Sequence, residues 1–172
     1  TGAVMERYFI GDTHFGHDAV YRFTHSDGTR VRDFADNSED GDAIMIERWN
    51  KVVKPNDRVY HLGDVAFPRR KLALLDQLNG NKILIKGNHD MFDVKDYMKY
   101  FKDIRGAFEL YKMMLTHIPI HPQQLKRFDA NIHGHIHDRT MGDRQYINVS
   151  VEMINATPIS LDEVLYRRDY GQ

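Results

Sequence analysis

Apolar residues along this chain gather in short runs, and most of these runs stop at a glycine followed by a polar side chain. Short apolar runs bounded by turn residues predict strands that end in loops. Three such runs lie in the first half of the chain, at 7–12 (RYFIGD), 57–64 (DRVYHLGD) and 81–88 (NKILIKGN).

Helical spacing separates these three runs. Between the first and second, apolar residues recur three and four positions apart until a proline ends the pattern, at Ile46, Trp49, Val53 and Pro55. Between the second and third, leucines repeat every third position before an Asn-Gly pair, at Leu72, Leu75, Leu78 and Asn79-Gly80. This alternation predicts parallel strands joined by right-handed crossovers.

The pattern of apolar residues changes after a further short helix, which is expected around 94–101. Strand-like runs follow with no long helical pattern between them, at 108–117, 129–135 and 144–151. A more antiparallel sheet is therefore expected in this half. Ser160 and Glu163 have the spacing of a capping box, which predicts a short terminal helix.

Composition narrows the class of protein. The 172 residues are 41% hydrophobic and 28% charged, which predicts one globular domain, residues 1–172. Residues 1–4 precede Met5 and are expected to be a cloning remnant. No secretory signal and no apolar run of about 20 residues is found, so we expect a cytoplasmic protein without a membrane span.

Charge and cysteine content limit the partners and the chemistry. The formal net charge is −1, which argues against extended nucleic-acid binding. Arg22, Arg30 and Arg32 nevertheless lie in a long irregular stretch, 18–38, which we expect to be functional and which could meet a polyanion. Because the chain has no cysteine, any metal must be held by His, Asp, Glu or Asn.

Candidate metal ligands stand at the ends of five apolar runs. In four of the five, a glycine comes directly before the first candidate and lets the backbone turn sharply. Because sites in open α/β sheets form at the carboxyl ends of strands, these five ends could converge on one crevice. The candidates are Asp12, His14, Asp64, Asn88, His117, His135 and His137.

Seven donors are too many for one ion and suit two ions that share a carboxylate. Asp64 is the expected bridge, with each of its two oxygens facing one metal. His135 and His137 alternate along an expected strand, which would place both on one face, about 6.6 to 6.8 Å apart. Two divalent cations and two aspartates leave a pocket charge of +2, which favours a phosphate.

Other polar residues nearby have expected roles of a different kind. His89 follows Asn88 and is expected to act as a general acid, with Asp90 as its orienter. His61 is balanced between strand packing and a role beside the site, and His25 is expected to be a solvated or hydrogen-bonded side chain and not a ligand. Three more histidines are candidates for indirect contact with the site, namely His17, His121 and His133.

The ordered pattern D-x-H, G-D, G-N-H-D, H, G-H-x-H resembles the calcineurin-like metallophosphoesterase superfamily. It reads here Asp12/His14, Gly63-Asp64, Gly87-Asn88-His89-Asp90, His117 and Gly134-His135/His137. The compact length and the form DTHFGH are similar to small bacterial and phage phosphoesterases. The segment 63–68 (GDVAFP) departs from the GDxVDRG motif of protein Ser/Thr phosphatases, which argues against that activity.

The resemblance implies an α/β fold of four αββα layers, in which two mixed sheets are flanked by helices. It implies one ion held by Asp12, His14, Asp64 and His137, and a second held by Asp64, Asn88, His117 and His135. His89 matches the proton donor of the family. The two divalent ions would be manganese first, with iron, zinc or nickel as alternatives.

The expected activity is hydrolysis of a phosphodiester or phosphomonoester by a metal-bridging hydroxide, with a nucleotide among the candidate substrates. A nuclease with the same metal chemistry is one alternative, and a non-catalytic metal-binding scaffold is another. The sequence leaves the oligomeric state open.

Overall fold

The computed structural model describes residues 4–172, so the expected cloning remnant lies outside the described residues except for Val4. The first sheet has the strand order β4-β3-β2-β1-β9. Its strands are β1 (Arg7–Ile10), β2 (Arg58–His61), β3 (Asn81–Ile85), β4 (Asp103–Arg105) and β9 (Ile159–Ser160). The first four run parallel and β9 is antiparallel to β1, which confirms the predicted parallel arrangement of the first three runs.

The second sheet has the strand order β5-β6-β7-β8. Its strands are β5 (Phe108–Leu110), β6 (Met113–Leu115), β7 (Ala130–His133) and β8 (Tyr146–Asn148). Only β5 and β6 pair antiparallel, while β6 with β7 and β7 with β8 pair parallel, so the expectation of a more antiparallel sheet in this half was wrong. A parallel return needs about a dozen residues but not a long helix, and the irregular segment 134–145 supplies it between β7 and β8.

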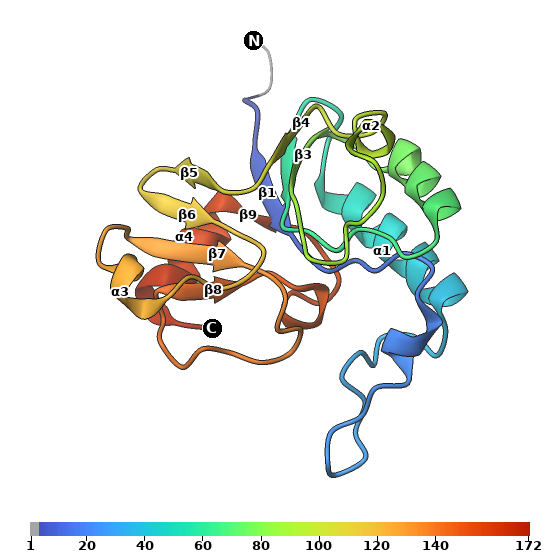
Figure 1. Cartoon of the computed structure of the whole chain (residues 1–172), viewed down its shortest axis with the longest axis horizontal. Coiled ribbons are helices and arrows are strands. Elements are labelled where there is room, and N and C mark those ends of the chain that lie inside the picture. The colour runs from blue at the N-terminus through green and yellow to red at the C-terminus, as the bar shows by residue number, and fades with distance from the viewer. Residues whose placement is uncertain (1–3) are drawn as a thin grey trace.

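Helices cover the outer faces of the sheets (Figure 1). The predicted helix before Pro55 is α1 (Ser38–Val52), which begins where the Asn37 side chain accepts from the Asp40 N–H and buries Met45 and Trp49. The leucine repeat forms a 3-10 helix, η2 (Arg69–Gln77). Three residues per turn place leucines at every third position on one side, which explains the repeat. The sequence predicted a helix here but not its type.

The remaining helices are short, apart from α4. The capping box of Ser160 and Glu163 starts α4, as predicted, because Ser160 Oγ accepts from the Glu163 N–H at 3.2 Å. The remaining helices, α4 included, are η1 (Asp18–Tyr21), α2 (Val94–Tyr97), α3 (Pro122–Leu125), η3 (Val151–Met153) and α4 (Leu161–Tyr170).

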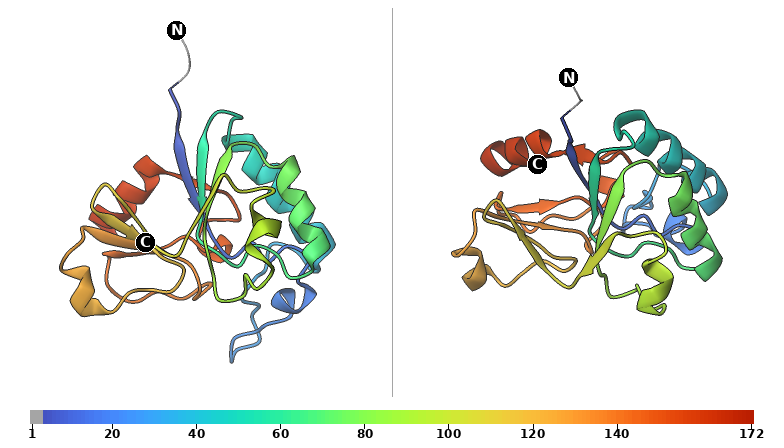
Figure 2. Two further views of the ribbon diagram at one scale, coloured as in Figure 1. Left: turned by 45° about the horizontal axis from the view of Figure 1, so that its top comes forward. Right: turned by 90° about the horizontal axis from the view of Figure 1, so that it is seen from above.

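The layers follow from this arrangement. Figure 2 shows α1 and η2 beside the first sheet and α4 beside the second, with the two sheets between them. One apolar core joins both sheets and includes Phe9, Leu62, Met113, Ile132 and Ile147. The predicted α/β fold of two mixed sheets flanked by helices is therefore confirmed. Within residues 4–172, the helices are too short or too polar to cross a bilayer.

The stretch 18–38 leaves the body of the molecule as an extended excursion at the lower right of Figure 1. Only η1 and one antiparallel bridge, between Thr24 and Arg30, give it regular structure. Val20, Tyr21 and Ala35 form a small apolar cluster of their own, which packs against Phe34 and Ile44. The excursion is thereby attached to α1.

Candidate metal centre

The carboxyl ends of strands from both sheets meet at one place. Backbone pairing continues there beyond the strands, because Gly11 forms a parallel bridge with Ser150 and the Gly134 N–H donates to the His117 carbonyl at 3.0 Å. The candidate ligands follow directly: Asp12 and His14 after β1, Asp64 after β2, Asn88 after β3, His117 after β6, and His135 and His137 after β7. Parallel strands thus bring the five polar blocks to a common edge.

Two groups of donor atoms are close enough to hold ions. Asp12, His14 and His137 offer ligand atoms within 4.8 Å of one another, and so do Asp12, Asp64 and His117. In the second group, His117 Nε2 is also 2.9 Å from Asn88 Oδ1. Ligands at about 2.0 to 2.2 Å from one cation lie at such separations from each other.

Asp64 belongs to the second group and also approaches the first. Its Oδ2 is 3.5 Å from His14 Nε2 and 3.3 Å from His117 Nε2. Its Oδ1 instead accepts a hydrogen bond from the His89 backbone N–H at 2.9 Å. In this geometry a single oxygen, Oδ2, approaches both imidazoles, whereas the sequence predicted that each oxygen of Asp64 would face one ion.

Two buried donor atoms of this centre lack a hydrogen-bond partner among the described residues, namely Asp12 Oδ1 and His14 Nε2. The other oxygen of Asp12 is fixed, since it accepts from Ser150 Oγ and the His135 N–H, both at 2.9 Å. Buried polar atoms without partners are costly, and a divalent cation between these two would satisfy both. A donor set of carboxylate, imidazole and amide groups therefore fits the expected metals.

The electrostatics of the centre favour ionised carboxylates. Burial would raise the pKa of Asp12, but the neighbouring imidazoles of His14, His117 and His137 outweigh burial and lower it to about 2. The pKa of Asp64 is also lowered, because the nearby imidazoles of His117 and His14 outweigh the effect of burial. Both side chains are thus anions ready to bind a cation.

The backbone of this centre is unusual. Five candidate ligands have φ in the left-handed region: Asp12 (55°), His14 (47°), Asp64 (58°), His135 (74°) and His137 (53°). Such conformations cost roughly 1–3 kcal/mol each and persist only when the surroundings impose them.

The left-handed turns also correct the expected placement of His135 and His137. The strand β7 ends at His133, so these two residues lie in a turn and not on one face of an extended segment. Their rings go to different partners, since the His137 ring centroid is 5.0 Å from that of His14 and the His135 centroid is 5.1 Å from that of His117. His137 therefore joins the first group, while His135 lies beside the second.

Glycine is required where the blocks approach one another. Gly63 has φ of 99°, and a Cβ there would lie 2.7 Å from His117 Nδ1 and from the backbone of Gly87. At Gly134 an added Cβ would meet the Asp12 carboxylate. The glycines that mark the motif in the sequence therefore provide space as well as turns.

His89 and Asp90 differ in environment. His89 is exposed, and its ring lies 6.3 Å from His14 and 5.3 Å from Phe67, between centroids. Asp90 is buried and its two oxygens accept from three backbone N–H groups, those of Asp64, Val65 and Gly87. The expected role of Asp90 as orienter of the His89 ring was wrong, because both oxygens are committed to the backbone of the Asp64 and Gly87 turns.

Two of the other histidines lie behind the candidate ligands. His17 Nδ1 is 3.1 Å from His14 Nδ1, and its ring stacks on Phe67 with centroids 3.7 Å apart. His61 is buried and bonds Thr13 Oγ1 and the Gly63 N–H, so it supports two ligand turns at once.

The remaining histidines serve local structure. His133 is buried against the Gly134 carbonyl, and exposed His121 accepts from the Gln123 N–H at the start of α3. His25 is hydrogen-bonded, as the sequence allowed, because its ring bonds Thr29 Oγ1 and Asp138 Oδ2. This contact joins the 18–38 excursion to the turn that carries His137.

Sequence reasoning missed Glu152, which lies in η3 and contacts His137 Nδ1 with both oxygens at 3.2 Å. Arg32 was placed on a surface facing a polyanion but is completely buried beside Glu152. The run 144–151 ends in polar side chains as the other five do, with Ser150 and Glu152 at the same edge. That signal was available, but the run lacks the glycine that marks most of the other blocks.

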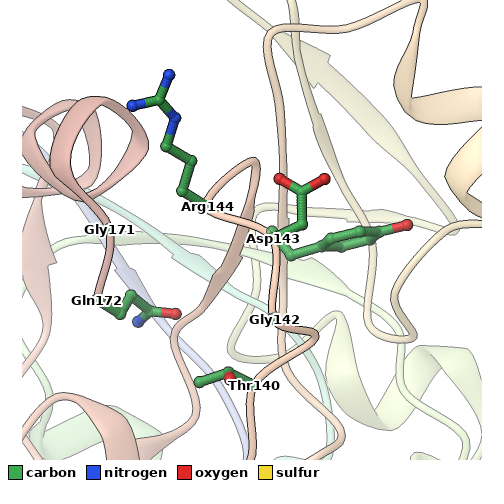
Figure 3. A pocket seen from close by; sticks show the side chains of 7 residues that line it. Thr140, Gly142, Asp143, Arg144, Gly171 and Gln172 are labelled. Carbon is green, nitrogen blue, oxygen red and sulfur yellow. The ribbon is translucent and has the colours of Figure 1, made fainter.

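A pocket lies beside the C-terminal residues Gly171 and Gln172 (Figure 3). Its lining consists of Thr140, Gly142, Asp143, Arg144, Tyr146, Gly171 and Gln172. None of the seven candidate ligands contributes to it. A groove that does include Asn88 and His117 is lined also by exposed Lys86 and by Thr116 and Ile118.

The chain is similar to several known proteins. The uncharacterized protein MJ1445 of Methanocaldococcus jannaschii is 37% identical over 96% of this chain and 92% of its own length. The Gene 66 protein of Mycobacterium phage D29 is 27% identical over 91% of this chain and 92% of its own. Among solved structures, protein AQ665 of Aquifex aeolicus, described as of unknown function, superimposes with a TM-score of 0.75 at 28% identity, over 95% of this chain and 99% of that one.

A family model shows the relationship over most of the chain. The model for calcineurin-like phosphoesterases matches residues 5–124, which include the first four of the five polar blocks. The family predicted from those motifs is thereby confirmed, and this chain belongs to the calcineurin-like phosphoesterases.

Proposed function

We propose that this protein hydrolyses a phosphate ester with the help of two divalent cations, manganese being the first candidate. The observation that carries the proposal is the position of Asp64 Oδ2, 3.5 Å from His14 Nε2 and 3.3 Å from His117 Nε2. An anionic oxygen that approaches an imidazole of each group is what a shared ligand of two cations requires. The unpartnered atoms of Asp12 and His14 support the same arrangement.

The cations, when bound, would supply an activated water and positive charge for the phosphoryl oxygens. Asp12, His14, Asp64 and His137 would hold one of them, and Asp64, Asn88, His117 and His135 the other. Lys86, exposed in the groove beside Asn88 and His117, adds a positive charge where an anionic substrate would enter. His89, exposed next to His14 and Phe67, would give a proton to the oxygen that leaves phosphorus.

The proposal favours a small substrate, such as a nucleotide, over a nucleic acid. Arg32 is completely buried, and Arg30 is held by Asp36 at 3.1 Å and by the Ala35 carbonyl at 2.9 Å. Of the three arginines in the long excursion, only Arg22 remains exposed and without these contacts. These contacts leave the 18–38 excursion without the exposed basic surface that a nuclease would need to bind a nucleic acid.

The test measures release of p-nitrophenol from bis(p-nitrophenyl) phosphate and from p-nitrophenyl phosphate, with manganese and after chelation. We expect manganese-dependent turnover of these esters. Because p-nitrophenolate leaves without a proton, His89→Ala is assayed on a dinucleotide, whose leaving alkoxide needs one, and there we expect it to lose at least 100-fold in kcat while it binds manganese as the wild type does. His121→Ala is the matched control, because that exposed histidine caps α3 and should leave the rate unchanged. Lack of hydrolysis of both esters with manganese, iron, zinc and nickel would contradict the proposal.

A further inference from the structure

Glu152 is a buried carboxylate that the proposed reaction does not use. Its side chain is 1% exposed, although the residue follows a strand end at the surface of the metal centre. Both of its oxygens are 3.2 Å from His137 Nδ1, and Oε2 is 2.7 Å from Arg32 Nε. A carboxylate this deeply buried is stable only when paired and hydrogen-bonded, and these two partners meet that need.

Arg32 reaches this place from the long 18–38 excursion. Its side chain is fully buried, and besides Glu152 it donates to the Thr13 carbonyl at 2.9 Å and to the Asp12 carbonyl. The planar guanidinium can serve all three acceptors at once because its donors form a fixed fork. One side chain therefore joins η3, the turn that carries Asp12, and the excursion.

The contact with Glu152 determines which nitrogen of His137 can bind a metal. Nδ1 carries the proton and donates it to the carboxylate, so the lone pair of Nε2 is left for a cation. A carboxylate behind a metal-bound imidazole fixes the ring and makes it a better donor, and removal of such partners commonly costs 10- to 100-fold in metal affinity.

The second group of ligands has a different support. His117 Nδ1 lies 2.6 Å from the carbonyl oxygen of Leu62, which is neutral. His137 in the first group therefore has an ionised carboxylate behind it, and His117 in the second has a backbone carbonyl. Loss of the carboxylate should affect one ion and spare the other.

We propose that Glu152 and Arg32 are positioning residues of the metal centre, which orient His137 and the Asp12–Thr13 turn for the ion held by Asp12, His14, Asp64 and His137. The excursion 18–38 thereby becomes a structural part of that ion's site. This inference rests on the metal centre of the proposed function.

The experiment titrates Glu152→Gln with Mn²⁺, following bound ion by calorimetry and free ion by electron paramagnetic resonance. Gln keeps the size and an acceptor oxygen but removes the charge. We expect the Kd of one ion to rise about 10- to 100-fold and that of the other to stay within twofold. With Co²⁺ in place of Mn²⁺, the visible absorption of one of the two ions should also change.

A second variant and a control separate positioning from simple stability. Arg32→Lys keeps the charge but cannot serve three acceptors, so the affinity of the same ion should fall without loss of the other. Glu163→Gln on α4, which breaks the ion pair with Arg167 at 2.9 Å, should leave both Kd values unchanged.

Two outcomes would overturn different claims. If metal-free Glu152→Gln unfolds at a lower temperature but binds both ions as the wild type does, Glu152 is only structural and this inference fails. If the wild type itself binds no Mn²⁺, the proposed function fails instead.

Discussion

Individual residues in this protein combine roles that the sequence shows only in part. Asp90 belongs to the motif Gly87-Asn88-His89-Asp90, yet its carboxylate faces the backbone of two ligand turns and not the neighbouring imidazole. Hydrogen bonds to a charged acceptor contribute about 1.5–3 kcal/mol each. Asp90 is therefore expected to maintain the shape of the centre.

Replacement of Asp90 by alanine should lower the free energy of unfolding by about 3 kcal/mol or more, because three buried N–H groups lose their acceptor. Urea denaturation of the metal-free protein measures this. Asp93→Ala is the control, since the exposed Asp93 caps no backbone N–H of α2, and its effect should stay within about 0.5 kcal/mol. Equal stabilities of the two variants would contradict the assigned role.

Gly63 and Gly142 provide a matched pair for the close approach of the ligand turns. Both have positive φ, but a Cβ at Gly142 would meet nothing within 4 Å, whereas one at Gly63 would lie 2.7 Å from His117 Nδ1. Gly142→Ala should cost about 1–2 kcal/mol from the backbone alone. Gly63→Ala should cost about 1–3 kcal/mol more through overpacking, and it should weaken metal binding as well. Similar losses in thermal denaturation would show that the space at Gly63 is not needed.

At the scale of elements, the sequence correctly predicted features that depend on neighbouring residues, but it failed for strand pairing, which depends on contacts between distant segments. The capping box of Ser160, the helix before Pro55 and the three-residue leucine repeat each depend on neighbours in the chain, and each element was found. The direction of the strands in the second sheet depends on crossovers that have no helical pattern, so the sequence favoured the wrong pairing.

The same distinction applies to the candidate site. Glycine followed by Asp, Asn or His identified the blocks because the turns are local. The alternation of His135 and His137 was misread as a strand, since the left-handed turn after Gly134 follows from packing against Asp12. Glu152 has no such local mark, because only the folded chain brings it to Arg32, 120 positions away.

The cap of α4 gives a test at this scale. Ser160→Ala should lower the free energy of unfolding by about 1 kcal/mol, because the Glu163 N–H loses its acceptor. Urea denaturation measures the difference, and Ser26→Ala, at an exposed position of the excursion, serves as the control. A loss no greater than that of the control would mean that packing alone holds α4.

For the whole molecule, the candidate centre lies where the two sheets meet. Asp12, His14, Asp64 and Asn88 follow strands of the first sheet, and His117, His135 and His137 follow strands of the second. Bound cations would therefore connect the two sheets, in addition to the apolar core that they share.

Metal binding should consequently stabilise the folded protein as a whole. At a free Mn²⁺ concentration 100 times the Kd, one site should add about 2.7 kcal/mol. Differential scanning calorimetry with Mn²⁺ and with a chelator should show a higher Tm with the metal. Asp64→Asn, which removes the charge shared by both groups, should lose most of this shift. A wild-type Tm that does not respond to Mn²⁺ would contradict the link between the sheets.

The left-handed backbone at five candidate ligands has a consequence for redesign of the centre. Asp and His are among the non-glycine residues that adopt this conformation most readily, so the residue types that suit the metal also suit the turns. Exchange of these ligands for cysteine or methionine, to recruit softer metals, would meet a conformational penalty before any question of coordination arises. The backbone conformation therefore limits which metal ions this centre can be redesigned to bind.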